Sequence, residues 1–492
     1  MKCLKKNQNR IMNNRKRRHL IGAAFLSVAF PVLTRAQNFS FLRQSYDVVI
    51  AGAGAAGLSA AIEATDAGAR VAIFEKAPEI GGNTLISGGF FAAVDLPRQK
   101  KQNIEDSVEL FYQQTFQFGG GAADPALVRH LVENATEALH WLESLGVRFE
   151  SDVIGLYGSH WQRVHVPVLP LGTGYIRALS AAALKRGVKI CTSADVTDLY
   201  FEKGRAAGVV VKIAGKQEIV HASRAVVIAS GSFASNNKLV AQHAPHLQGL
   251  TTNNIPTTDG ELMMAAHRHG VALRDMDAVQ CLPGCPPNKK FRVRFHNDVS
   301  RHIYVDARAR RFIREDAARD DIRDAVLALP EKYGYLIVDN NGFEAAGILT
   351  QKEVILAIEG GEAWKASSIP ALARKMGLDP QTLKQTIAEY NLAVRNGHDP
   401  LGKSPRELKH ELKQPPFWAC YAGMTVHYTE GGLVINDKAQ CLDSNARPIP
   451  GLFAAGAVTG GVHGRNRLGG NGLADAVVFG RTAGQNAAAE KN

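Results

Sequence analysis

The clearest hydrophobic pattern in the chain predicts a strand, a turn and a helix between residues 46 and 69. Residues 46–51 are apolar except for Asp47 and are rich in β-branched side chains, which is typical of a buried strand. They run into Gly52-Ala53-Gly54-Ala55-Ala56-Gly57, and a helical pattern then continues to Ala69. A second apolar strand follows over residues 70–74 and ends at Glu75. This order predicts a βαβ unit and a parallel sheet.

The turn after the first strand has the glycine spacing of a dinucleotide-binding site. Gly52 permits a tight turn, Gly54 admits a pyrophosphate, and Gly57 lets the helix pack on the sheet, so that phosphate meets the helix N-terminus. Glu75 lies at the tip of the second strand, where its carboxylate accepts hydrogen bonds from the ribose. The pattern therefore predicts a bound dinucleotide, and the alternative is a βαβ unit without a ligand.

Four further segments favour FAD over a nicotinamide cofactor. Residues 81–89 form a second glycine-rich loop, residues 225–232 and 452–457 are apolar strands that end in small residues, and residues 469–472 open the last predicted helix. Backbone from separate segments suits an extended ligand such as FAD. The predicted FAD-binding residues are Gly52, Gly54, Ala56, Gly57, Glu75, Lys76, Gly82, Asn83, Thr84, Gly88, Gly89, Val196, Ser230, Gly231, Gly456, Ala457, Asn471, Gly472 and Leu473.

Composition and charge restrict the class of protein. The 492 residues, 45% of them hydrophobic and 21% charged, suit a globular chain with one large core and an inserted second domain, or with two domains. The formal charge of +12 is concentrated in residues 1–36, which contain nine Lys and Arg and no Asp or Glu. The remainder carries +3, so no nucleic-acid partner is predicted.

Residues 1–36 have the pattern of an export signal. The basic run Arg15-Lys16-Arg17-Arg18 precedes an apolar stretch over residues 20–33, and Thr34-Arg35-Ala36 offers small residues for cleavage. The paired arginines resemble a twin-arginine signal, the alternative is an ordinary secretory leader, and Met12 is a second candidate for the start. The apolar stretch is short for a membrane span. The pattern predicts a periplasmic protein with no membrane span in the mature chain.

Five cysteines follow the leader, and their number predicts no disulfide framework. The sequence allows one disulfide in an oxidising compartment, for example between Cys281 and Cys285. The same two residues are a weak metal signal without partner ligands nearby, so no metal site is predicted. The sequence has no Cys-x-x-Cys-His motif, so no c-type haem attaches to it.

The motifs resemble the flavoprotein family of fumarate reductases and succinate dehydrogenases. Residues 81–84, 229–234 and 460–471 carry the resemblance, which is greatest to the soluble, exported flavocytochrome c and urocanate reductase branch. It implies an α/β fold, with a Rossmann-like FAD-binding domain and an inserted α+β capping domain. The expected boundaries are 1–36 for the signal peptide, 39–282 and 413–492 for the two parts of the FAD-binding domain, and 283–412 for the capping domain.

The resemblance also implies how the cofactor is held. Asn83 stands where the membrane-bound members carry the histidine that bonds the flavin covalently, so non-covalent FAD is expected. Ala457 stands where the family usually has a glutamate that holds the ribityl chain. That departure calls the ribityl contact into question.

Three residues match active-site positions of the family. Arg467 matches the arginine that clamps a substrate carboxylate, His427 the histidine that bonds the same carboxylate, and Arg319 the arginine proposed as proton donor. A planar guanidinium binds a carboxylate through two parallel bonds and stabilises the charge that builds on it. The resemblance therefore predicts Arg319, His427 and Arg467 as the catalytic residues.

The residues alone leave alternatives to these roles. Arg319 lies in the charged stretch 308–323, which by itself favours a solvated helix face. His427 by itself is more often a structural histidine. Arginine rarely gives up a proton, so Arg319 needs a relay to act as an acid. The acids near it in sequence are Asp316, Asp320 and Asp321.

Two departures from the fumarate reductases predict a different substrate. Leu282 and, approximately, Arg294-Phe295 stand where the family holds the second carboxylate of fumarate. Apolar Leu282 and Phe295 cannot bind a carboxylate, so they predict a pocket for an apolar or aromatic tail. Two alternatives stay open: a polar group recruited by Arg292, Arg294 and His296, and a segment over residues 157–165 that is either part of this pocket or a surface loop.

The sequence therefore predicts an exported FAD-dependent reductase of an α,β-unsaturated carboxylic acid other than fumarate. Flavin N5 supplies the hydride, Arg319 supplies the proton, and a separate c-type cytochrome supplies electrons in anaerobic respiration. The alternatives are an FAD-dependent dehydrogenase that runs the reverse reaction and a catalytically silent electron-transfer flavoprotein. The presence of both arginines and His427 argues against the silent protein.

Overall fold

The computed structural model describes residues 44–491, with gaps at 157, 159–160, 286–294 and 296–297. The predicted signal peptide over residues 1–36 lies outside the described residues and stays a prediction. The same holds for six residues named above for the substrate pocket, namely Tyr157, Ser159, His160, Arg292, Arg294 and His296.

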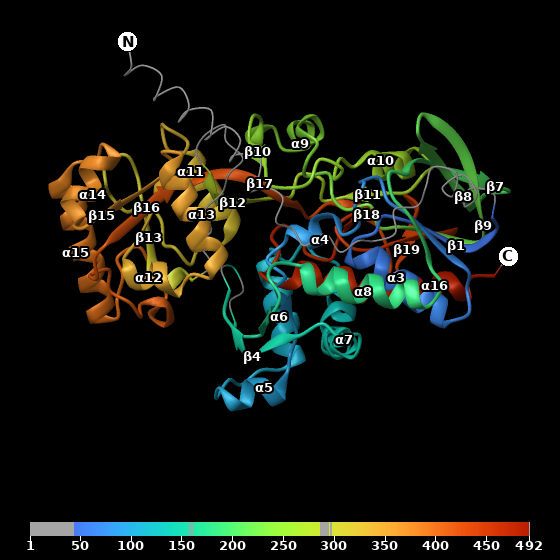
Figure 1. Cartoon of the computed structure of the whole chain (residues 1–492), viewed down its shortest axis with the longest axis horizontal. Helices are drawn as coiled ribbons and strands as arrows, with labels where there is room; N and C mark the ends of the chain where they lie inside the picture. Colours follow the sequence, from blue (N-terminus) through green and yellow to red (C-terminus); the bar gives the residue numbers. More distant parts are fainter. Residues whose placement is uncertain (1–43, 157, 159–160, 286–294, 296–297, 492) are drawn as a thin grey trace, which may run out of the picture. The chain divides into compact units, whose positions relative to one another are not determined.

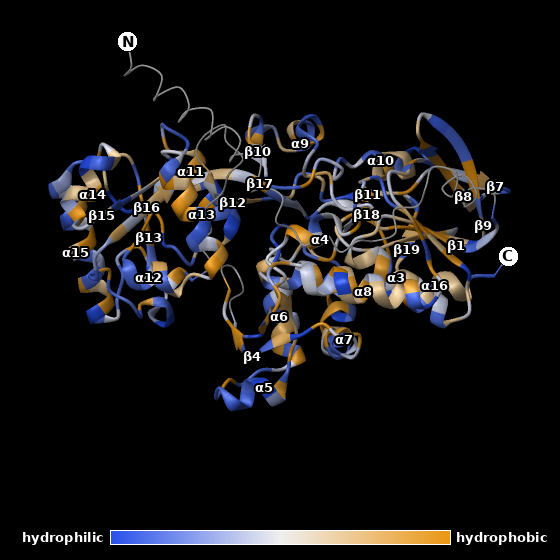
Figure 2. Cartoon of the chain, in the orientation of Figure 1, coloured by the Kyte–Doolittle hydropathy of each residue, from blue (hydrophilic) through white to orange (hydrophobic). Residues whose placement is uncertain are grey.

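A parallel sheet built from both ends of the chain forms the centre of the FAD-binding part (Figure 1). Its order is β20-β9-β1-β2-β6, with β1 at Tyr46–Ala51, β2 at Val71–Phe74, β6 at Lys189–Cys191, β9 at Lys216–Ile228 and β20 at Pro448–Ala454. The paired cores of its inner strands, residues 48–51, 71–74 and 225–228, consist of buried Val, Ile, Ala and Phe, as expected for strands covered on both faces. In Figure 2 hydrophobic residues colour this sheet, whereas the first half of β9 is hydrophilic. The predicted α/β fold is confirmed.

Helix α16 (Asn471–Ala489), the last helix of the chain, packs against α3 (Ala55–Asp66), the helix that follows β1. Figure 1 shows α8 (Thr173–Lys185), α3 and α16 side by side. Glycine makes the α3–α16 contact close, because a Cβ at Gly484 would lie 2.2 Å from the carbonyl oxygen of Ala60. The C-terminal helix is thereby fixed against the helix that follows the glycine-rich turn.

The other elements of the FAD-binding part surround the sheet and carry the loops that form its site. The helices are α4 (Gly82–Ile86), α5 (Leu96–Lys101), α6 (Val108–Phe118), α7 (Pro125–Ser144), α9 (Asn237–His243) and α10 (Glu261–Arg268). The strands are β3 (Phe91–Ala92), β4 (Phe149–Ile154), β5 (Val164–Pro167), β7 (Asp195–Glu202), β8 (Arg205–Ile213), β10 (Thr251–Thr252), β11 (Leu273–Arg274), β12 (Val279–Cys285), β17 (Gly423–Thr429), β18 (Gly432–Val434), β19 (Gln440–Leu442) and β21 (Thr459–Gly460).

A second, antiparallel sheet lies in the segment expected to form the cap. Its order is β13-β14-β16-β15, with β13 at His302–Val305, β14 at Tyr335–Val338, β15 at Ala363–Ala366 and β16 at Phe417–Tyr421. Strand β16 follows residue 412, so we propose that the capping unit extends to Tyr421. Its helices are α11 (Arg319–Leu327), α12 (Asn340–Ala345), α13 (Ile348–Glu359), α14 (Ile369–Met376) and α15 (Pro380–Asn396).

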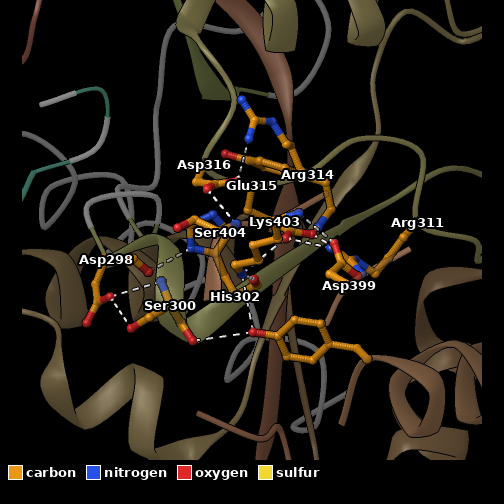
Figure 3. A network of polar contacts seen from close by, with 12 residues as sticks. Asp298, Ser300, His302, Arg311, Arg314, Glu315, Asp316, Asp399, Lys403 and Ser404 are labelled. Carbon is orange, nitrogen blue, oxygen red and sulfur yellow. Dashed lines mark hydrogen bonds and ion pairs between the residues drawn. The ribbon is translucent and has the colours of Figure 1, made fainter. Parts of the chain in front are cut away.

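A buried ion cluster holds the segment that leads into α11 (Figure 3). The carboxylate of Glu315 lies 3.1 Å from Lys403 Nζ and 2.8 Å from Arg311 Nη2, and Arg311 Nη1 lies 2.6 Å from Asp399. Burial opposes ionisation of Glu315, but Lys403 and Arg311 outweigh it and lower its pKa. Removing one partner of such a pair costs about 3–5 kcal/mol. The cluster therefore fixes the chain just before Arg319, the first residue of α11.

Three absences hold for the described part of the chain. No helix there is long and apolar enough to cross a membrane. The five described cysteines are buried and none forms a disulfide with another, so no disulfide joins Cys281 and Cys285. The same residues hold no group of three His, Cys, Asp or Glu side chains that could bind a metal ion.

Candidate functional site

A cavity of about 590 Å³ lies at the carboxyl ends of β1, β2, β9 and β20, the edge at which α/β sheets bind ligands. Its wall contains every predicted FAD-binding residue except Gly57 and Asn471. Gly57 lies against the backbone of the glycine-rich turn rather than on the cavity wall, since a Cβ there would lie 1.9 Å from the carbonyl oxygen of Gly52. Asn471 is buried at the start of α16, and its Nδ2 donates to Thr115 Oγ1 at 3.3 Å.

The part of the cavity next to α3 has a backbone shape that requires glycine. Gly52 has a φ of +108°, and a Cβ there would lie 2.3 Å from the carbonyl oxygen of Ala229. Gly54 is the N-cap of α3, whose first N–H groups favour a phosphate. The buried hydroxyl of Ser230 lies on the same wall and has no hydrogen-bond partner among the described residues. A phosphate would supply that partner, so these residues fit the pyrophosphate of FAD.

Glu75 and Lys76 line the cavity beyond the end of β2. The two carboxylate oxygens of Glu75 each accept a backbone N–H at 2.8 Å, which fixes the carboxylate and leaves lone pairs for ribose hydroxyls. Burial raises the pKa of Glu75 against the effect of these two bonds. Lys76 Nζ lies 2.7 Å from Asp259 and 2.7 Å from Glu261, so its charge is compensated by the protein.

Asn83 lies on the wall and is held by other amides. Its Nδ2 donates to Asn254 Oδ1 at 2.5 Å, and its Oδ1 accepts from the N–H of Ile255 at 3.0 Å. Asn254 Nδ2 in turn donates to the carbonyl oxygen of His427 at 3.0 Å. A neutral amide has no nucleophilic nitrogen for a covalent bond to flavin. Ala457 also lines the cavity, and it offers only a methyl group there.

Arg319, His427 and Arg467 lie on the wall of this same cavity, although three separate segments supply them. Arg319 begins α11, His427 lies on β17, and Arg467 lies in the loop before α16. Both arginines are buried, with 5% and 6% of their surface exposed. The solvated helix face that residues 308–323 favour on their own is therefore wrong for Arg319.

Gln280 on β12 joins the two arginines, and the sequence analysis missed it. Its side-chain oxygen accepts from Arg319 Nη1 at 2.7 Å and from Arg467 Nη2 at 2.8 Å. These two nitrogens are therefore at most 5.5 Å apart, the sum of the two bonds. Two unit charges at that distance repel by roughly 3 kcal/mol at an effective dielectric constant of about 20. The available signal was one amide in an otherwise apolar strand.

Close neighbours fix where each guanidinium lies. The Arg467 guanidinium carbon lies 4.3 Å from the centre of the Tyr428 ring, a cation–π contact. A Cβ at Gly472 would lie 3.0 Å from Arg467 Nη1, and one at Gly158 would lie 2.8 Å from Arg319 Nε. Both glycines therefore leave the room that the arginine side chains occupy.

His427 is held on one side of its ring by Asn253. The side-chain amide of Asn253 lies 3.2 Å from His427 Nδ1. This contact engages Nδ1, so Nε2 is the ring atom that can contact a substrate. The orientation of the Asn253 amide selects the tautomer, and an amide that donates to Nδ1 makes Nε2 a donor.

A buried carboxyl group adjoins the arginine pair. Glu430 follows β17, is 1% exposed, and has no hydrogen-bond partner for either oxygen among the described residues. Burial raises its pKa to about 8, although Arg467, Arg319 and Arg323 favour its ionised form. Near neutral pH Glu430 is therefore largely protonated, and it does not itself neutralise the two cavity arginines.

Leu282 and Phe295, predicted to receive a substrate tail, do not line the cavity. Leu282 is buried in β12 opposite Thr425, and the Phe295 ring contacts the Phe343 ring with centroids 6.3 Å apart. Neither residue is among the described lining residues, so the structure does not support the predicted tail pocket at Leu282 and Phe295. The apolar residues that the described wall presents include Phe90, Leu156 and Ile255.

The described residues of the segment 157–165 are mainly structural. Arg163 is 1% exposed and lies 2.7 Å from the carboxylate of Asp106. His165 is fully buried, with Nε2 3.4 Å from Asp95. Neither lines the cavity, so their cationic and ring character serves ion pairing inside the fold.

One of the three candidate relay acids joins the network of the arginine pair. Asp320 Oδ1 accepts from Asn466 Nδ2 at 2.5 Å, and Asn466 Oδ1 accepts from Gln280 Nε2 at 3.3 Å. Burial raises the pKa of Asp320. Asp316 instead accepts from the N–H of Ser404 at 2.9 Å.

A family model described as FAD binding domain matches residues 47–473. The chain belongs to the FAD binding domain family. The match runs from the first strand through the capping segment to the loop that holds Arg467. The protein is thus an FAD-dependent oxidoreductase, and FAD is the cofactor that its glycine-rich cavity fits.

Known members of the FAD binding domain family resemble the chain over most of its length. NADH:fumarate oxidoreductase of Klebsiella pneumoniae is 34% identical over 447 residues, which cover 90% of this chain and 48% of that protein, so the chain spans about half of it. The acrylate reductase flavoprotein subunit of Shewanella woodyi is 34% identical over 94% of this chain and 95% of its own. A flavocytochrome c3 fumarate reductase in an open conformation is 33% identical, with a TM-score of 0.73 over 91% of this chain and 78% of its own. The predicted family resemblance is confirmed.

The raised pKa of Glu430 predicts a pH-dependent stability. Between its ordinary value of 4.5 and about 8, the folded state holds a proton that the unfolded state releases. The free energy of unfolding should therefore fall as pH rises through this window, by roughly 3–5 kcal/mol more in the wild type than in Glu430→Gln. Urea unfolding at about pH 5 and about pH 8.5 measures the difference. Exposed Glu218→Gln is the control, and equal pH dependence in all three proteins would contradict the burial of a protonated Glu430.

Proposed function

We propose that the chain is a reductase of an α,β-unsaturated carboxylic acid that uses non-covalently held FAD. The observation that carries this proposal is the arginine pair: Arg319 and Arg467 are buried on one cavity wall and share one neutral acceptor. Two buried cations are stabilised by an anion, and the two oxygens of a carboxylate match planar guanidinium groups. His427 on the same wall supports a third contact to that anion.

The residues divide the reaction between binding and proton donation. Reduced FAD, when bound, would supply a hydride to the carbon β to the carboxylate and would be left as oxidised FAD. Arg467 and His427 bind the carboxylate, and Arg467 stabilises the negative charge that develops on its oxygens and on the α carbon. Arg319 donates the proton to the α carbon. The double bond thus gains one hydride and one proton and becomes a single bond.

Asp320 is the acid that we propose returns a proton to Arg319. Asp320 belongs to the network of Arg319 through Asn466 and Gln280, whose amides hold the groups in place but do not themselves pass a proton. Burial, and then the neighbouring Asp321, raise the pKa of Asp320, the direction that a proton donor requires. Asp316 makes a backbone contact elsewhere and supports the fold instead.

We propose a substrate with a single carboxylate. The cations on the described wall are Lys76, Arg319 and Arg467, and Lys76 is already paired with two acids. The arginine pair therefore serves one carboxylate, and no other cation of the described wall awaits a second. These charges favour a monocarboxylic enoate over fumarate.

Export to the periplasm and a separate c-type cytochrome donor complete the proposal. The basic run and apolar stretch before residue 36 support export. The likeness to a flavocytochrome c3 and to a protein named a flavoprotein subunit supports a partner that carries electrons. The neutral amide of Asn83 supports FAD without a covalent bond.

The FAD-loaded protein is expected to oxidise a reduced viologen dye when a monocarboxylic enoate is added. Acrylate, urocanate and an aryl-substituted acrylate should be reduced faster than fumarate, because the described wall pairs only one carboxylate with arginine. Loss of dye colour reports the rate without the natural donor. Faster reduction of fumarate than of every monocarboxylic enoate would contradict the substrate class. Oxidation of the saturated acids with no enoate reduction would favour the reverse dehydrogenase.

Replacement of Arg467 tests the carboxylate contact in the same assay. Arg467→Lys keeps the charge but loses the planar, two-bond geometry, so kcat/KM should fall by about 10²- to 10³-fold. Arg465→Lys is the matched control, since that side chain is 58% exposed and pairs with Asp277 at the surface. Equal rates for the two variants would place the carboxylate elsewhere. Undiminished turnover by Arg319→Met would remove Arg319 as the proton donor.

A further inference from the structure

Gln280 uses every hydrogen-bonding group of its side-chain amide within the site. Its oxygen accepts from both arginines, and its Nε2 donates to the carbonyl oxygen of Arg467 at 3.1 Å and to Asn466 Oδ1 at 3.3 Å. The residue is 4% exposed. Because the two acceptors fix where the NH₂ group lies, the oxygen must face the two guanidinium groups.

The strands around Gln280 also support the two arginines. Gln280 pairs with Tyr428 across β12 and β17, and the Tyr428 ring lies against the Arg467 guanidinium. On the other side, Arg323 of α11 donates to the carbonyl oxygen of Val279 at 3.0 Å. Gln280 thus lies between Arg319, from the segment expected to form the cap, and Arg467, from the FAD-binding part.

We propose that Gln280 is a positioning residue that holds Arg319 and Arg467 side by side and leaves their positive charge for the substrate carboxylate. The inference rests on the proposed function, because it names the group that keeps the anion site of that enzyme charged. Gln280 touches the arginines and need not touch the substrate.

The neutral amide explains why this position suits glutamine. A glutamate of the same shape would place a carboxylate between the guanidinium groups and compete with the substrate for them. It would also lack the N–H groups that bind Asn466 and the carbonyl of Arg467. A methionine would leave both charges in place but remove the acceptor that brings them together. Gln280→Glu therefore tests the free positive charge of the arginine pair, and Gln280→Met tests how the two guanidinium groups are positioned.

The test compares Gln280→Glu and Gln280→Met in the FAD-loaded full-length protein. Propionate, a saturated monocarboxylate that cannot accept a hydride, is titrated while the flavin absorption spectrum is followed. Gln280→Glu should bind propionate at least about tenfold more weakly than the wild type, and Gln280→Met within about threefold of it. Gln280→Met should instead lower kcat for the best enoate at least about tenfold, because the guanidinium groups lose their alignment.

A glutamate introduced far from the cavity is the control for the added charge. Gln217→Glu adds the same charge on the exposed β8–β9 hairpin and should bind propionate as the wild type does. A purely structural role would shift both variants alike in affinity and in kcat, which would overturn the proposal. Wild-type affinity in Gln280→Glu would also overturn it, as would a wild type that binds no propionate. If Gln280→Glu fails to fold, the kcat of Gln280→Met still tests the proposal. An unchanged kcat in that variant would overturn the positioning role of Gln280.

The propionate titration also separates this inference from the proposed function. Propionate binding that follows the predicted order, with no reduction of any enoate, would support the charged anion site and overturn only the reaction. Reduction of enoates with unchanged propionate binding in Gln280→Glu would support the reaction and overturn the role of Gln280.

Discussion

Repulsion between the buried guanidinium groups of Arg319 and Arg467 is the constraint on which the site depends. The groups share one amide oxygen, and the carboxyl group of Glu430 beside them is raised in pKa to about 8 by its burial. The protein thus keeps two positive charges together in a place that water hardly reaches. Such an arrangement is least stable when empty and gains most from a bound anion.

The fold holds the two charges from different directions. Arg467 lies in the loop that leads into α16, a helix fixed against α3 by a glycine contact. Arg319 begins α11, and the buried ion cluster around Glu315 fixes the chain just before it. Each arginine is therefore positioned by interactions that do not involve the other. Gln280 is the residue at which the two supports join.

The glycine-rich wall and the arginine pair belong to one cavity, which places the redox cofactor and the anion site together. The same wall holds few other uncompensated charges, since the protein itself pairs Lys76 with acids. The cavity can therefore hold one end of a substrate through its carboxylate, whereas charged side chains do not select the other end of the substrate. This division suits reduction of a double bond next to a carboxylate.

The sequence predicted the cofactor site better than the substrate site, and local geometry is the reason. A strand, a glycine turn and an acid such as Glu75 are consecutive, so their spacing alone specifies the βαβ unit. The burial of Arg319 depends on segments far away in the chain, and its charged surroundings favoured solvent exposure instead. Gln280 was missed because one amide in a strand reveals nothing of the residues across from it. Leu282 was expected in the substrate pocket, but it is buried in β12 and is not among the described residues of the wall, a placement that depends on contacts far away in the chain.

A crystal structure of the FAD-loaded protein with bound propionate tests the central claim most directly. The account predicts one carboxylate bound to Arg467 and within hydrogen-bond distance of His427, with Arg319 next to the α carbon and the isoalloxazine ring beside the ligand. A carboxylate bound elsewhere, or arginine side chains that leave Gln280 and turn away from the ring, would contradict it.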